Sequence, residues 1–219
     1  MEKIEFTLFG LHLLEPMALI TNSLIAIVCS WIFFKLFRKN KTDEYVHYWA
    51  LFFLTFALST FGGGFAHLFY NYTGDYGKIP VFSLAVIANF FIDRACFTLV
   101  EDRKKRDWIE YILIAKTVLS VLLIAGMVEY IGKKIFLIVQ FNTIITAAGI
   151  LVWFGIKTKD NSDAWKYFFF GIGILLITAL VQILKINIHL WFNKDDFSHI
   201  LITISMLLFY KGVKRFKSL

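Results

Sequence analysis

The chain has 219 residues, of which 58% are hydrophobic and 18% aromatic, and its formal net charge is +7. Charged residues make up 18% of the chain and lie in short blocks between long apolar runs, whereas they make up about a quarter of an ordinary soluble domain. This pattern excludes a soluble globular domain and is typical of a membrane protein. The positive charge does not indicate nucleic-acid binding, because the basic residues lie in the connections and the tail, where they orient a membrane protein.

Seven apolar runs approach the ~20 residues that a helix needs to cross the hydrocarbon core of a bilayer. We therefore predict an all-α membrane protein, a single seven-transmembrane helix bundle formed by residues 1–219. The predicted spans are 16–37, 48–70, 81–100, 108–127, 135–156, 165–191 and 197–213. Short connections between them predict that consecutive helices pack antiparallel.

Basic residues in the connections predict the orientation of the bundle. Thirteen lysines and arginines flank the spans on one side and five on the other, and cytoplasmic loops carry the excess. The N-terminus is therefore predicted outside and the C-terminus in the cytoplasm of a cell membrane, the inner membrane of a bacterium. In this orientation, polar residues from distant parts of the chain lie at one depth near the outer face: Glu15, His67, Asp75, His189, Asp195, Asp196 and His199.

The start of the last predicted span carries a pair of residues that could bind a metal ion or take part in catalysis. Asp195 and His199 are four residues apart and share one helix face. A carboxylate and an imidazole at that spacing can bind one metal ion or act as an acid–base pair. The alternative is that residues 193–196 cap the helix and that His199 is an interfacial histidine.

Two other spans offer polar faces. Ser59, Gly63 and His67 recur every four residues, and such a stripe of small residues lets another helix approach closely. The alternative is that the glycines only pack and His67 faces the lipid interface. In the sixth span, Lys185 and His189 follow Gln182 on one face that could line a cavity, unless Lys185 extends towards the membrane surface.

Charged residues deeper in the spans are interpreted as structural. Asp93 and Arg94 are expected to pair with other spans or to anchor at the inner interface. Lys116 is interpreted as an isolated cation that supports no specific mechanism. A retinal protein is excluded by the absence of lysine in 197–210, and no P-loop, G-x-S-x-G or H-E-x-x-H motif occurs.

The arrangement of His67, the carboxylate that follows it and the Asp195/His199 pair resembles the seven-helix superfamily of alkaline ceramidases and adiponectin/progestin receptors. In that superfamily the second span ends in Ser-x-x-x-His, an aspartate follows, and the seventh span carries His-x-x-x-His. The three histidines hold a zinc ion whose water attacks a lipid amide. Ceramidases also have an acidic, proline-containing entry to the first span, similar to Glu15-Pro16.

The resemblance implies a Zn²⁺ ion held by His67, Asp195 and His199. Asp75 would orient or deprotonate the metal-bound water, and Asp196 is the second catalytic candidate. Zinc accepts a carboxylate ligand, so Asp195 in place of the first histidine is compatible with a metal. Gly63 stands where the family has serine, which removes a hydroxyl that could stabilise an oxyanion. The other pocket candidates are Glu15, Ser59, Gly63, Lys185 and His189.

These observations favour a metal-dependent membrane hydrolase that acts on a lipid amide or ester, with the membrane lipid as the source of its substrate. The active site would lie near the outer face. The first alternative is a transporter or a small-molecule or lipid receptor that uses the same polar pocket without catalysis. The second is a membrane scaffold, in which these residues affect stability alone.

Overall fold

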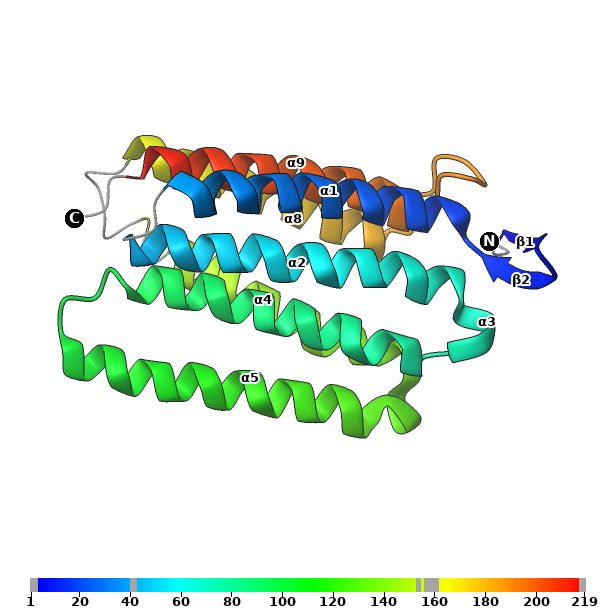
Figure 1. Ribbon diagram of the computed structural model, residues 1–219, viewed down its shortest axis with the longest axis horizontal. Coiled ribbons are helices and arrows are strands. Elements are labelled where there is room, and N and C mark those ends of the chain that lie inside the picture. Colours follow the sequence, from blue (N-terminus) through cyan, green and yellow to red (C-terminus); the bar gives the residue numbers. More distant parts are fainter. Residues whose placement is uncertain (1–3, 40–42, 153–154, 156–161, 217–219) are drawn as a thin grey trace.

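The computed structural model of the protein describes residues 4–39, 43–152, 155 and 162–216. It is a bundle of long helices preceded by a small β-hairpin (Figure 1). In the described part of the chain, six helices are long and apolar enough to span a membrane. They are α1 (Pro16–Lys39), α2 (Glu44–Leu68), α4 (Ile79–Phe97), α5 (Arg103–Ile131), α8 (Ser162–Ile183) and α9 (Lys194–Arg215). The predicted all-helical membrane bundle is thereby confirmed.

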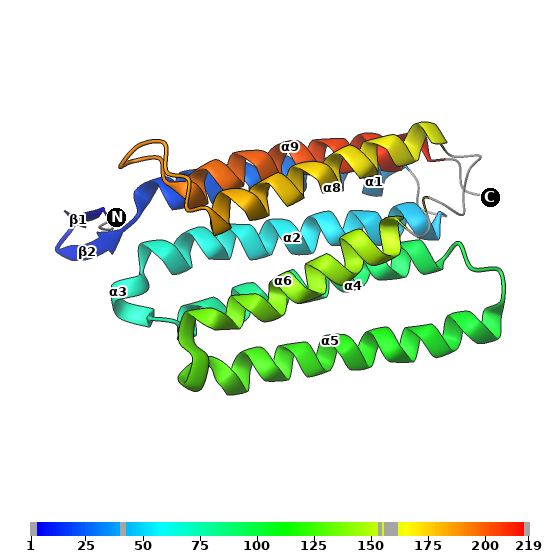
Figure 2. The same ribbon diagram turned by 180° about the vertical axis from the view of Figure 1, so that it is seen from behind.

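A shorter apolar helix lies where the fifth span was predicted. It consists of α6 (Phe136–Ile144), which continues directly into the π-helix η3 (Ile145–Leu151). Figure 2 shows it beside α4, and both parts contact that helix. The end of the predicted span, at 153–154 and 156, lies outside the described residues.

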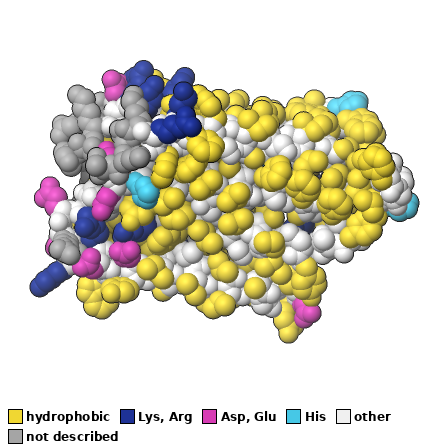
Figure 3. Space-filling view, in the orientation of Figure 1, with side chains coloured by type: hydrophobic (Ala, Val, Ile, Leu, Met, Phe, Trp, Pro, Cys, Tyr) yellow, Lys and Arg dark blue, Asp and Glu magenta, His cyan; other side chains and the backbone are white. Residues whose placement is uncertain are grey.

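The membrane-exposed surface and the ends of the bundle differ in composition. Hydrophobic side chains cover most of the middle of the face seen in Figure 3. Most of the charged side chains on that face gather at the end where α9 finishes, opposite the hairpin. An apolar middle with charged ends is what a bilayer requires of a spanning bundle.

The N-terminal arm forms a hairpin that the sequence did not predict. Strands β1 (Glu5–Leu8) and β2 (Leu11–Leu14) pair antiparallel. Phe9 and Gly10 connect them with φ angles of 51° and 78°. Positive φ at both central residues is the geometry of a two-residue turn that matches the twist of the strands. Phe9 is an unusual residue there, which explains why no turn was predicted.

The predicted sixth span, 165–191, was too long. Helix α8 ends at Ile183, and Lys185 adopts a left-handed conformation with φ 53°. The N–H of Lys185 donates to the carbonyl of Gln182 at 3.3 Å, and the N–H of Ile186 donates to Val181 at 3.1 Å. This pair of bonds is the Schellman ending of a helix, which usually has glycine at the left-handed position. Residues 184–193 therefore form a loop.

The interpretation of Lys116 as an isolated cation was also wrong. Its ammonium forms an ion pair with the Asp93 carboxylate of α4, which is fully buried. Arg94 pairs with Glu110 of α5 at 2.8 Å and donates to the Tyr48 hydroxyl of α2 at 2.8 Å. Asp93 and Arg94 thus pair with other spans, as predicted.

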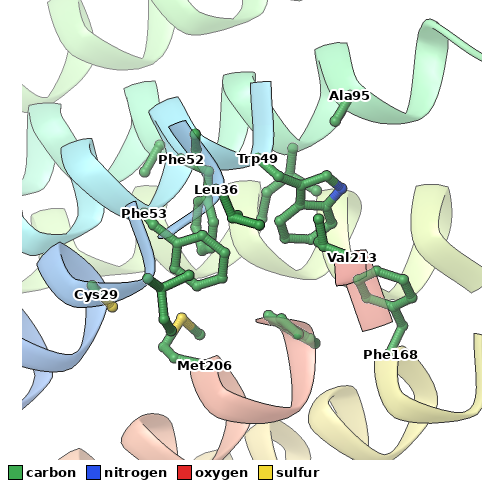
Figure 4. Close-up of a cluster of buried hydrophobic side chains, with 14 of the residues drawn as sticks. Cys29, Leu36, Trp49, Phe52, Phe53, Ala95, Phe168, Met206 and Val213 are labelled. Carbon is green, nitrogen blue, oxygen red and sulfur yellow. The ribbon is translucent and has the colours of Figure 1, made fainter. Parts of the chain in front are cut away.

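Aromatic packing joins α2, α8 and α9 in the main core (Figure 4). The rings of Trp49 and Phe168 stack with centroids 5.2 Å apart. Gly171 lies against Phe209, and a Cβ atom there would approach the Phe209 ring to 2.4 Å. Gly173 on the same helix has open space within 4 Å.

Gly171→Ala should therefore lower the free energy of unfolding by about 1–3 kcal/mol, since a close-packed core resists an added methyl group. Gly173→Ala is the matched control and should be neutral or stabilising, because alanine favours helix by about 1 kcal/mol over glycine. Thermal unfolding of both variants in detergent measures the difference. Equal midpoints for the two variants would contradict the packing described.

Candidate functional site

The start of α1, the end of α2, the start of α9 and the loop 184–193 meet at the hairpin end of the bundle (Figure 1). Each of these elements contributes a polar side chain to that end. The following contacts define the site.

His67, in the last turn of α2, pairs with Glu15, which immediately precedes α1. The distance from Nδ1 to Oε2 is 2.9 Å, and the side chains are 28% and 10% exposed. A carboxylate at Nδ1 fixes the orientation of the ring and leaves Nε2 for another partner. Glu15 has a φ of 48°, although the residue before a proline is normally extended.

His199 belongs to a second chain of contacts, with α1. Its Nδ1 lies 2.8 Å from the hydroxyl of Thr21, and the same hydroxyl lies 3.2 Å from Oδ1 of Asp196. The hydroxyl has a single proton, and the carbonyl of Met17, at 3.0 Å, is a second acceptor for it beside Asp196. With that proton given to either oxygen, the hydroxyl accepts from Nδ1–H of His199, which leaves Nε2 of the ring as an acceptor.

The two aspartates have different roles. Asp196 and Asn193 form a capping box at the start of α9: the Asn193 side chain accepts from the N–H of Asp196, and the Asp196 carboxylate accepts from the N–H of Asn193. The cap interpretation is thus confirmed for residue 196. Asp195 instead accepts from the Lys194 ammonium at 2.8 Å and from the Gln182 amide at 2.9 Å.

Five residues predicted for the site come together. His67 lies within electrostatic range of Asp195 and His199. Glu15 lies within electrostatic range of Asp196 and His199. The predicted common depth of these residues therefore corresponds to a real cluster, built from α1, α2 and α9.

Other predicted residues lie elsewhere. Asp75 pairs with Lys78 at 2.9 Å and accepts from Tyr70 at 3.3 Å. Its other oxygen lies beside Gly132, after the end of α5. His189 is exposed in the loop, where its Nδ1 accepts from the N–H of Trp191. Asp75 and His189 therefore have no contact with the cluster among the described residues.

The predicted stripe on α2 is mainly a packing surface. The Ser59 hydroxyl donates to the carbonyl of Val81 in α4 at 2.9 Å. A Cβ atom on Gly63 would lie 3.4 Å from Oδ1 of Asn22 and 3.5 Å from Val81. Gly63 thus allows Asn22 of α1 to approach, and the amide of Asn22 lies 3.5 Å from Nδ1 of His199.

A cavity of about 230 Å³ opens beside this cluster. Its charged lining residues are Glu15, Lys185, Lys194, Asp195 and Asp196. The rest of the wall consists of the amides of Asn187 and Asn193 and of apolar side chains: Ile4, Pro16, Met17 and Leu190. Three residues other than glycine have positive φ in the described chain, and two of them, Glu15 and Lys185, line this cavity.

Sequence patterns missed several members of the site. Thr21 and Asn22 were not singled out, although both lie in the second turn of α1, close to the Glu15-Pro16 entry. Lys194 was counted only for orientation. Gln182 was expected on a polar face, and its amide in fact joins α8 to α9 by donating to the Ser198 hydroxyl at 2.9 Å.

The donor arrangement does not fit the three-ligand zinc site that the family resemblance implied. No group of three or more His, Cys, Asp and Glu side chains in the described ranges is placed to hold a metal ion. Asp195 is turned to Lys194 and Gln182. Asp75 lies away from the cluster, where it pairs with Lys78. His67 and His199 each use Nδ1 for a polar partner, so Nε2 is the ring nitrogen that each could offer to a ligand.

A comparison with protein-family models finds one described as "Family of unknown function (DUF6962)", which matches residues 17–218. The chain belongs to this family. The match includes His67, Lys185, Asp195, Asp196 and His199, and it begins just after the Glu15-Pro16 entry. Neither the curated proteins nor the solved structures contain a match to the chain.

Proposed function

We propose that the protein crosses the membrane seven times, with the hairpin outside and the end of α9 in the cytoplasm. The hairpin and the end of α9 lie at opposite ends of the bundle (Figure 1), which requires an odd number of passes. The shorter helix α6–η3 supplies the seventh. The excess of lysine and arginine on the α9 end supports the orientation, and it supports a cell membrane, such as a bacterial inner membrane, as the location.

The cavity at the outer end is a binding site for a small zwitterion, in a transporter or a receptor. Lys185 carries this proposal. Within the described residues its ammonium has no ion-pair partner, and its backbone is held in a conformation that costs a lysine roughly 1–2 kcal/mol. Strained residues persist where the surrounding structure or a function requires them.

The charges of the cavity explain the choice of a zwitterion. Lys194 neutralises Asp195 at 2.8 Å, and Glu15 has His67 as its partner at 2.9 Å. These pairs leave Lys185 on the exposed side of the cavity and the buried carboxylate of Asp196 on the other. An anionic group of the ligand would bind Lys185, and a cationic group would face Asp196.

Thermal unfolding with a panel of small molecules tests this function. Glycine betaine and glycerophosphocholine, which are permanent zwitterions, should raise the unfolding midpoint of the purified protein in a saturable manner, because ligands that bind the folded state stabilise it. Choline and acetate carry one charge each and serve as controls. Equal shifts with all four compounds, or none with the zwitterions, would refute the assignment.

A metal-dependent lipid hydrolase is the second candidate. It is supported by His67 and His199, which lie within electrostatic range of each other. Each is oriented through Nδ1 by a polar partner, as metal-ligating histidines usually are. The two rings would supply the protein ligands, and a bound metal would supply a water of increased acidity.

Elemental analysis of the purified protein tests this candidate directly. Stoichiometric zinc that falls by at least half in both His67→Ala and His199→Ala would establish it. His189→Ala, which changes a histidine outside the cluster, is the matched control and should leave the metal content unchanged. Zinc far below one equivalent in the parent protein would remove this candidate.

A further inference from the structure

A second polar cluster lies inside the bundle, far from the outer-end cavity along the helices. Three neighbouring elements each carry two polar residues spaced four apart, so that each pair lies on one helix face. The pairs are Asn89 and Asp93 in α4, Lys116 and Ser120 in α5, and Asn142 and Thr146 in α6–η3.

Direct contacts connect the three faces. Lys116 forms the ion pair with Asp93. The amide of Asn142 donates to the Ser120 hydroxyl at 3.0 Å. The amide of Asn89 donates to Thr143 at 3.0 Å. The cluster therefore joins α4, α5 and α6–η3 through polar bonds in a region where lipid surrounds the bundle.

Three polar atoms of this cluster are buried and have no hydrogen-bond partner among the described residues. They are Oδ1 of Asp93, Oδ1 of Asn142 and Oγ1 of Thr146. Their residues are 0%, 3% and 0% exposed. A buried polar group without a partner is costly, and such groups usually mark an ordered water or ion.

Helix spacing and one side-chain contact relate the three residues to one another. Thr146 lies one turn after Asn142 on the same face. Its hydroxyl lies near enough to the Asp93 carboxylate for a direct interaction, but the two atoms do not meet the geometry of a hydrogen bond. Thr146 also lies in the π-helical segment Ile145–Leu151. Such segments are rare and widen the helix locally, often at functional sites.

We infer that Asp93, Asn142 and Thr146 form a binding site for one ordered water molecule inside the bundle. The donor and acceptor count matches: the water donates one hydrogen to Oδ1 of Asp93 and the other to Oδ1 of Asn142, and it accepts from the Thr146 hydroxyl. Three hydrogen bonds are typical of a buried water. The site hydrates the ion pair of Asp93 and Lys116.

A metal cation fits this site less well. The ammonium of Lys116 already lies on the Asp93 carboxylate, and a second positive charge close to it is repelled. A proton on Oδ1 of Asp93 would satisfy this atom and one neighbouring oxygen, and would leave the third atom without a partner. Water alone satisfies all three.

Solid-state NMR of the full chain in lipid bilayers tests the site by transfer of magnetisation from water to side chains. Asn142 and Thr146 should receive water magnetisation severalfold faster than Asn89 and Thr143. Asn89 and Thr143 are a matched control in neighbouring turns. They form a direct hydrogen bond with each other, so no water is needed between them. Equally slow transfer to both pairs would overturn the inference.

A variant and two further measurements complete the test. Thr146→Val keeps the shape of the side chain and removes one of the three bonds, so it should slow the transfer to Asn142 severalfold. A carboxylic-acid infrared band at neutral pH that disappears in Asp93→Asn would identify a proton and overturn the inference. Thermal stabilisation by sodium chloride but not by choline chloride, lost in Asp93→Asn, would identify a cation and also overturn it.

Discussion

Replacing Lys116 with methionine should lower the free energy of unfolding by about 3–5 kcal/mol, because it leaves the buried Asp93 carboxylate without its counter-charge. Asp93 is 0% exposed, and Lys116 is its ion-pair partner. Methionine keeps much of the length and apolar stem of lysine, so lost packing contributes little. Equilibrium unfolding in detergent micelles measures the loss.

Two controls isolate the charge effect. Lys166→Met breaks an exposed ion pair with Asp163 and should cost less than about 1 kcal/mol. The double variant Asp93→Leu and Lys116→Met should recover most of the loss, because neither charge then remains buried. If Lys116→Met were as stable as the parent protein, the buried pair would not exist in the folded state.

Replacing Lys185 with glycine should separate stability from binding. Glycine adopts the left-handed conformation at position 185 without strain, so the variant should be more stable by roughly 1 kcal/mol. The same change removes the Lys185 ammonium from the cavity. The affinity for a zwitterion should fall about tenfold or more, as expected for the loss of a bond to a charged group.

Phe9→Gly is the matched control for Lys185→Gly. Phe9 also has positive φ, is 94% exposed and is not among the lining residues of the cavity. It should gain similar stability and keep the affinity of the parent protein. Unfolding midpoints with and without glycerophosphocholine measure both effects, and unchanged affinity in Lys185→Gly would show that Lys185 does not bind the ligand.

The helices could be predicted because long apolar runs determine them almost alone. The positions at which the helices end depend instead on single residues. Helix α8 was predicted to continue to 191, because Lys185 occupies a left-handed position at which glycine normally marks the end of a helix. The hairpin was missed because Phe9 occupies a turn position that usually carries asparagine, aspartate or glycine.

The position of the site at the hairpin end of the bundle could also be predicted, whereas its contacts could not. Charge counting placed Glu15, His67 and His199 at one end of the bundle, and they do cluster there. The direction of each carboxylate depends on neighbours from other helices: Asp195 turns to Gln182 and Lys194. The pairing of Asp93 with Lys116 depends in the same way on the rotation of α4 against α5, which spacing within one helix does not encode.

Calorimetric titration of glycine betaine and glycerophosphocholine into the purified protein tests the central claim most directly. The cavity at the hairpin end predicts saturable heat with one site per chain for at least one of the two zwitterions, and the loss of this heat in Lys185→Gly. Heats no larger than dilution for both compounds, or equal binding by the parent protein and Lys185→Gly, would contradict the proposed function.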